Sequence, residues 1–230
     1  MGITSFEIQR AIKSKVFFMI GGLLGLSFIL SSPILHEYWP GDFALQIHIN
    51  DIRMLTMFSV PFLVAFIFRE CEGKLSNHVL FSQPVSLKKI AISKIVAIVF
   101  IYAAWTILWT RIFIVSPLAI GKAPYSLPAF LGGHLLVTLP LLVFMILFCA
   151  IVYVKSPNLI ALYIITLLFI VLLSYIPPAL NFSLKDKAFT EMFSAGYGNA
   201  SLLLINRIIT VLLIAALLFV FLRLYTKSLD

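Results

Sequence analysis

The chain has 230 residues, of which 62% are hydrophobic and only 11% are charged, and its formal net charge is +8. An average soluble domain has about 25% charged residues, so a soluble globule of this size could not cover so much apolar surface with polar groups. A disordered chain is excluded because such chains are less apolar and more highly charged. The composition predicts one transmembrane domain, 1–230, of the all-α class.

Six apolar stretches predict six transmembrane helices, since each approaches the ~20 residues that a bilayer requires. Strands of a membrane barrel would alternate apolar and polar residues, whereas 141–154 is apolar on all sides. The second stretch is short, and we expect it to extend through Ile52 and Arg53. The six stretches are 16–35, 54–68, 95–120, 135–154, 159–176 and 202–222.

The segment before the first crossing, 1–15, is predicted to be helical. Thr4 and Glu7 have the spacing of a capping box, which predicts a helix start at Thr4. Ile8 and Ile12 recur four residues apart and would share an apolar face. Two interpretations stay open: a helix lying in the cytoplasmic membrane interface, or a plain helical extension of the first crossing.

Two glycines in the first crossing, Gly21 and Gly25, have the spacing that allows close approach of another helix. The partner helix could belong to a second copy of the chain, or the contact could be ordinary packing within one chain.

The longest basic loop, 69–94, is predicted to hold a short, rigid helix between the second and third crossings. Gly73 can end the second crossing, Pro84 breaks the loop helix, and Ser86 can cap the helix that continues into the third crossing. A helix held at both ends transmits a push from a partner. The residues expected to shape this segment are Glu70, Glu72, Gly73, Lys74, Leu75, Val79, Pro84, Ser86, Lys88 and Lys89.

Arg111 is a charge inside the third stretch, about 24 Å from its start at 1.5 Å per residue. It either extends to the nearer membrane surface or lines a substrate path. Pro61 and Pro140 can kink the second and fourth crossings.

The loops predict the orientation, because cytoplasmic loops are enriched in Lys and Arg. Placing both ends of the chain in the cytoplasm puts eleven basic residues inside and five outside. The inside set is Arg10, Lys13, Lys15, Arg69, Lys74, Lys88, Lys89, Lys94, Lys155, Arg223 and Lys227. The net charge is thus explained by this bias and by contact with anionic lipids, with no nucleic-acid partner.

Sequence motifs for catalysis are absent. There is no phosphate loop for ATP, no paired histidine motif for a metal and no GxSxG nucleophile motif. Cys71 and Cys149 have no metal-binding spacing. We therefore expect no catalytic residue, metal or cofactor in this chain.

The loop pattern resembles the ABC-2 type permease family, the membrane subunits of ATP-binding-cassette exporters. The six crossings, the cytoplasmic ends and the polar N-terminal helix fit the same family. The matching residues are Glu70, Glu72, Gly73, Leu75, Pro84, Val85, Ser86, Lys88, Lys89 and Lys94.

The resemblance implies a dimer with a second copy or a homologous permease, and one ATPase subunit under each half that holds ATP and Mg. The N-terminal helix and the 69–94 segment would dock on the ATPases, and 177–201 would form an outer helical cap. The chain would sit in the cell membrane and export an amphiphilic or hydrophobic cargo such as a peptide, an antibiotic or a lipid-like molecule. Two alternatives stay open: an intramembrane enzyme, and a channel or scaffold that needs no ATPase.

Overall fold

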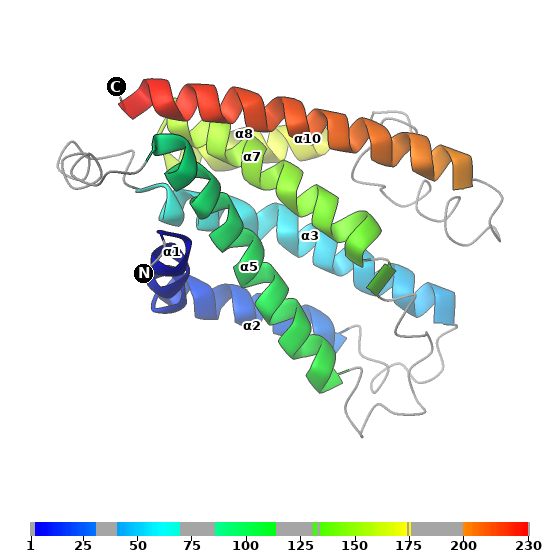
Figure 1. The fold of residues 1–230 in the computed structure, drawn as a ribbon. Helices are drawn as coiled ribbons and strands as arrows, with labels where there is room; N and C mark the ends of the chain where they lie inside the picture. The colour runs from blue at the N-terminus through cyan, green and yellow to red at the C-terminus, as the bar shows by residue number, and fades with distance from the viewer. Residues whose placement is uncertain are drawn as a thin grey trace.

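The computed structural model describes residues 3–30, 41–69, 86–113, 131–132, 134–173, 175 and 200–229. Every regular element in these ranges is helical, as the all-α prediction requires (Figure 1). The elements are α1 (Ile3–Ile12), α2 (Lys15–Leu30), α3 (Gly41–Ile67), α5 (Leu87–Phe113), the π-helical turn η2 (His134–Thr138), α7 (Leu139–Lys155), α8 (Leu159–Leu173) and α10 (Ala200–Leu229).

Three helical stretches are long and apolar enough to cross a bilayer: Leu87–Trp109, His134–Lys155 and Leu204–Lys227. They identify the chain as a membrane protein. Three shorter apolar helical stretches, Lys15–Leu26, Met54–Ile67 and Leu159–Leu172, fall within or close to the other predicted crossings.

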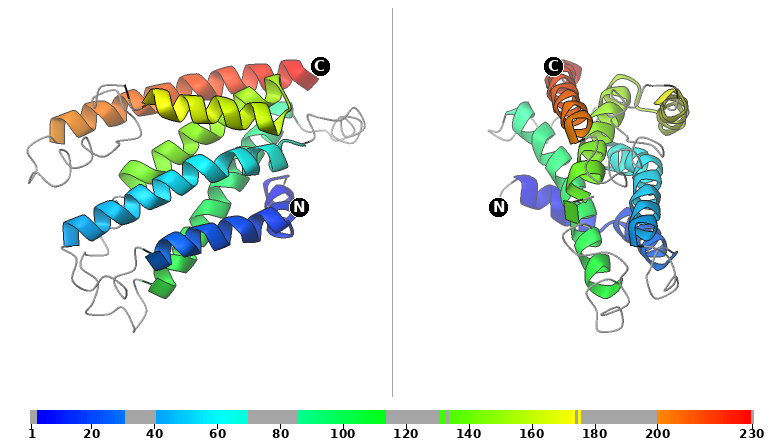
Figure 2. Two further views of the ribbon diagram at one scale, coloured as in Figure 1. Left: turned by 180° about the vertical axis from the view of Figure 1, so that it is seen from behind. Right: turned by 90° about the vertical axis from the view of Figure 1, so that its right-hand side faces the viewer.

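The long helices run side by side, and α7 lies among them, in contact with α3, α8 and α10 (Figures 1 and 2). The short helix α1 packs against the beginning of α5. The N-terminal helix and the C-terminal end of α10 lie at the same end of the bundle.

Two helix starts differ most from the starts of the predicted apolar stretches. Helix α3 begins at Gly41, well before the predicted start at 54, and α5 begins at Leu87 rather than at 95. At the start of α5, Ser86 Oγ accepts a hydrogen bond from the Lys89 amide at 3.4 Å, the cap that the sequence predicts. Hydropathy marks the apolar part of a helix, whereas a helix continues through polar residues once it is formed.

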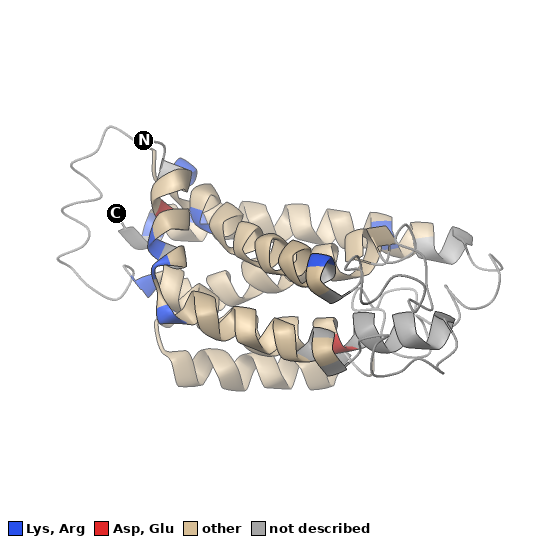
Figure 3. Cartoon of the chain, turned by 90° about the horizontal axis from the view of Figure 1, so that it is seen from below, with Lys and Arg blue, Asp and Glu red and all other residues tan. Residues whose placement is uncertain are grey.

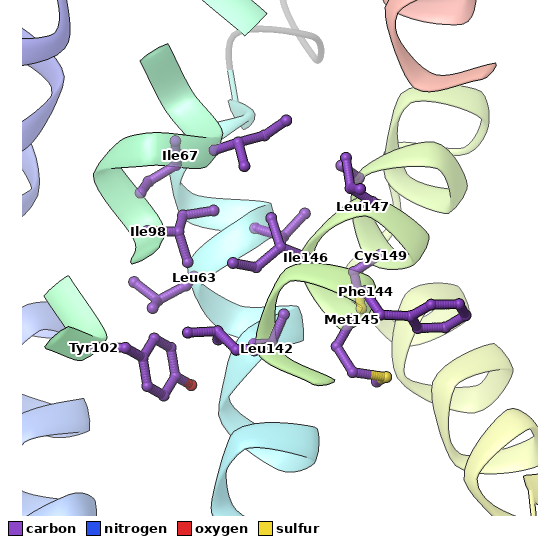
Figure 4. Packing of buried hydrophobic residues seen from close by; sticks show 14 of the residues in the cluster. Leu63, Ile67, Ile98, Tyr102, Leu142, Phe144, Met145, Ile146, Leu147 and Cys149 are labelled. Carbon is purple, nitrogen blue, oxygen red and sulfur yellow. The ribbon is translucent and has the colours of Figure 1, made fainter. Parts of the chain in front are cut away.

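The core is formed where α3, α5 and α7 meet. Leu63 of α3, Ile98 of α5 and Leu142 of α7 are almost completely buried there (Figure 4). Tyr102 of α5 shares a hydrogen bond with Ser59 of α3, so the polar groups of this contact are satisfied without water.

The outer helices expose their apolar side chains. Ile160 of α8 is 72% exposed and Phe219 of α10 is 68% exposed. Such surfaces would be unfavourable in water and are the normal state of helices in lipid. The exposed apolar faces therefore support the membrane assignment independently of helix length.

The glycines of α2 receive two tryptophans of α5. A Cβ atom at Gly21 would lie 2.2 Å from the Trp105 ring, and one at Gly25 would lie 2.4 Å from the Trp109 ring. The indole N–H of Trp105 donates to the Phe17 carbonyl at 3.1 Å, and that of Trp109 donates to the Gly21 carbonyl at 2.9 Å. In a helix the side chain at i+4 covers the carbonyl of residue i, so the glycines expose these acceptors. The two glycines thus pack against α5 of the same chain.

Candidate functional site at the basic end of the helices

Basic side chains gather at the end of the bundle where both chain ends lie (Figure 3). We call this the basic end. Of the described basic side chains, Arg111 and Arg207 lie toward the opposite end. Those at the basic end belong to α1 and the turn after it, to the starts of α2 and α5, or to the ends of α3, α7 and α10: Arg10, Lys13, Lys15, Arg69, Lys88, Lys89, Lys94, Lys155, Arg223 and Lys227. The basic residues that the sequence assigns to the cytoplasmic side therefore lie together at one end of the folded bundle.

A buried ion pair joins α1 to α5 at this end. Lys94 Nζ lies 2.9 Å from Glu7 Oε1, and the two side chains are only 1% and 3% exposed. Burying either charge alone would cost several kcal/mol, so each requires the other. Lys94 Nζ also lies 5.8 Å from the centre of the Phe68 ring, a favourable position for a cation.

The same cluster caps the end of α3. Ile67 is the last residue of α3, and its carbonyl has no partner within the helix. Lys94 Nζ donates to this oxygen at 3.0 Å, and Arg10 Nη2 donates to it at 2.9 Å. Arg10 Nη2 also lies 3.3 Å from Glu7 Oε2. The two cations also interact favourably with the negative, C-terminal end of the α3 helix dipole.

A second hydrogen bond fixes α1 one residue earlier along α5, where Thr4 Oγ1 lies 2.9 Å from Ser93 Oγ. We call the whole set the N-terminal clamp: Thr4, Glu7, Arg10, Ile67, Ser93 and Lys94. It ties α1 to the last turn of α3 and to the first two turns of α5. These are the two helix ends from which the 70–85 segment emerges.

The N-terminal clamp corrects one expectation about α1. Helix α1 begins at Ile3 in the described residues, so Thr4 lies inside the helix and bonds to Ser93 rather than serving as its cap. Glu7 is buried against α5, while Ile12 is 38% exposed and so remains available to lipid, as the interfacial-helix interpretation requires. The turn at residues 13–14 separates α1 from α2, which excludes a plain extension of the first crossing.

Several predicted coupling residues lie outside the described residues: Glu70, Glu72, Gly73, Lys74, Leu75, Val79 and Pro84. The predicted cap at 177–201 is likewise outside, except for its last two residues in α10. Ser86, Lys88 and Lys89 are exposed at the start of α5, next to the N-terminal clamp. Arg111 is exposed in the last turn of the same helix, far from them.

Sequence reasoning missed the partnership of Glu7 and Lys94. Lys94 was predicted only to be one of the cytoplasmic basic residues and a part of the permease pattern, and no carboxylate was predicted to bind it. The signal was present: Lys94 stands in the apolar run 90–98, where a cation needs an anion. The sequence alone does not say which carboxylate supplies it.

The described residues offer no metal site, since no group of three or more His, Cys, Asp or Glu side chains comes together among them. Cys149 is buried, and its sulfur lies 3.7 Å from Thr166 Oγ1. Comparison with protein-family models, with curated proteins and with solved structures gives no match to this chain.

Proposed function

We propose that the chain is the permease subunit of an ATP-binding-cassette exporter of the ABC-2 type. The observation that supports this best is the N-terminal clamp. It joins α1 to the end of α3 and to the start of α5, the two helix ends that flank the 70–85 segment in the chain. A load applied to that segment would reach three helices together, because the polar contacts among them are short and largely buried.

The proposed topology has six crossings, with both chain ends in the cytoplasm. Three long and three shorter apolar helical stretches supply the crossings. Helix α1 and the C-terminal part of α10 both lie at the basic end of the bundle. The positive-inside rule assigns this end to the cytoplasm. The protein would then be a multi-pass protein of the cell membrane.

In this proposal the chain does not hydrolyse ATP. ATP and Mg are bound by a separate ATPase subunit, two copies per complex, which docks on 69–94 and α1. The permease pairs with a second copy or a homologous permease, in contact with membrane lipids and without nucleic acid. The apolar helix surfaces favour an amphiphilic or hydrophobic cargo: a peptide, an antibiotic or a lipid-like molecule.

Site-specific photocrosslinking in native membranes tests the proposal. A photoreactive amino acid is placed at Leu75 and at Lys88, and as a control at the lipid-exposed Ile160 of α8. We expect adducts at the first two positions to contain a phosphate-loop ATPase, and the adduct at 160 to contain none. The complex purified through this chain should hydrolyse ATP in lipid nanodiscs.

The absence of an ATPase adduct at both positions, with no ATP hydrolysis in the purified complex, would refute the proposal. That result would leave a channel or scaffold that works without ATP. A catalytic turnover by the chain alone would favour an intramembrane enzyme.

A further inference from the structure

The π-helical turn η2 directly precedes α7, which has Pro140 in its first turn. Pro140 has no N–H, so the carbonyl of Leu136 lacks the donor that a regular helix would give it. Arg207 of α10 supplies one, since its Nη1 lies 2.6 Å from the Leu136 oxygen. The turn is thus held in place by another helix, and such turns occur frequently at functional sites.

A pocket of about 190 Å³ lies beside this turn, between α3, α5 and the η2–α7 helix. Most of its wall is hydrocarbon. Its polar side chains are Tyr102 and Thr106 of α5, and His134 and Thr138 of η2. His134 is the first residue of its apolar helical stretch, and its side chain is 9% exposed.

The pocket opens toward lipid. Ile107 and Leu135 belong to its lining, and they are 70% and 62% exposed. Both lie in or beside membrane-length apolar helices, so hydrocarbon chains surround the opening. An apolar cavity of ~150 Å³ is large enough for benzene, whereas drug-sized ligands need ~300 Å³ or more. The volume therefore suits part of one hydrocarbon chain.

The polar side of the pocket lies at the membrane depth of lipid ester groups. His134 is 21 residues from Lys155 in the same apolar stretch, which is roughly 30 Å at 1.5 Å per residue. A hydrocarbon core is also ~30 Å thick, so with Lys155 at one boundary His134 reaches the other. His134 Nδ1 lies 3.2 Å from Thr138 Oγ1, which places two polar groups at that boundary.

We propose that this pocket binds one acyl chain of a membrane lipid. The chain enters sideways past Ile107 and Leu135. Its ester carbonyl meets the Thr106 and Thr138 hydroxyls and the His134 imidazole, and its methylenes lie against the wall around the Tyr102 ring. All the residues that line the pocket come from one copy of the chain. Lipid binding here therefore requires no ATPase and does not rest on the proposed exporter function.

The test uses the purified full chain in nanodiscs whose phospholipid carries a diazirine near the ester group. Mass spectrometry then locates the labelled residues. We expect residues 102–107 and 134–138 to be labelled at least fivefold more than the lipid-exposed face of α8. Ala103→Phe should reduce this labelling at least fivefold, whereas Ile160→Phe should leave it unchanged. Ala103 lines the pocket, and Ile160 only faces lipid.

Thr138→Val removes a hydroxyl at nearly constant volume and should reduce the labelling about threefold. If Ala103→Phe does not fold, a competition experiment replaces it. Excess unlabelled phospholipid is added to the wild-type chain together with the probe, and labelling of the pocket is measured again. If the competitor lowers labelling of the pocket residues more than labelling of the α8 face, the result supports a lipid-binding site in the pocket. Labelling that follows side-chain exposure alone, with or without competitor, overturns the proposal.

Discussion

Lys94 Nζ of α5 lies 2.9 Å from Glu7 Oε1 of α1, although 87 residues separate the two in the chain. The pair is buried, and Lys94 at the same time binds the final carbonyl of α3. One ammonium group therefore fixes the mutual positions of three helices at the basic end. This is a strong constraint in a protein whose other helix contacts are mostly apolar.

Replacement of Glu7 tests how strongly the ion pair holds. Glu7→Gln leaves Lys94 buried without its anion, and breaking a buried pair from one side typically costs about 3–5 kcal/mol. We expect a clear drop in the unfolding temperature in detergent, measured by size-exclusion after heating. Lys13→Gln, at an exposed position of the same segment, should change it little.

The double variant Glu7→Leu with Lys94→Met sharpens this test. Since both charges of the buried pair are removed together, no unpaired buried charge remains, because Arg10, the other partner of Glu7, is 29% exposed, and most of the lost stability should return. Equal stability of Glu7→Gln and the wild type would contradict the assignment of Glu7 as the anion that Lys94 requires.

The glycines of α2 allow a matched comparison. Gly21→Ala places a methyl group against the Trp105 ring, which overpacks the contact and should cost about 1–3 kcal/mol. Gly22→Ala meets no atom within 4 Å and should be neutral or slightly stabilising. Thermal unfolding of the two variants gives the answer, and similar losses in both would exclude the tryptophan contact as the cause.

Leu75→Asp tests transmission through the 69–94 segment, and it rests on the proposed exporter function. We expect the variant to insert normally and to retain its ATPase partner, but to lose coupling between ATP hydrolysis and export, because the apolar face of the expected loop helix is disrupted. Leu75→Met should couple normally. Normal export by Leu75→Asp with the partner bound would show that coupling does not run through this residue.

Cysteine labelling tests the orientation. After Cys71 and Cys149 are replaced, a cysteine at Lys88 should react with a membrane-impermeant thiol reagent only after the membrane is opened. A cysteine at Arg111, exposed at the other end of α5, should react in intact cells. The reverse pattern would place the basic end outside and contradict the positive-inside assignment.

Much of the architecture is predictable from local sequence. The six apolar stretches, the helix start after Ser86 and the basic bias of one end all follow from residues close together in the chain, because transfer into lipid is a property of each segment by itself. The structure bears out the helical class, and it finds three of the stretches long enough to cross. It places helix ends beyond the apolar stretches, as at Gly41, because hydropathy does not report where a helix begins.

The partners of individual residues were decided only by the tertiary structure. That Glu7 meets Lys94, that Trp105 and Trp109 lie over Gly21 and Gly25, and that Arg207 reaches the carbonyl left open by Pro140 are contacts between distant segments. A sequence shows that a buried charge, a bare helix surface or an open carbonyl needs a partner. Which group meets that need depends on how the helices pack, and this is a collective property of the whole bundle.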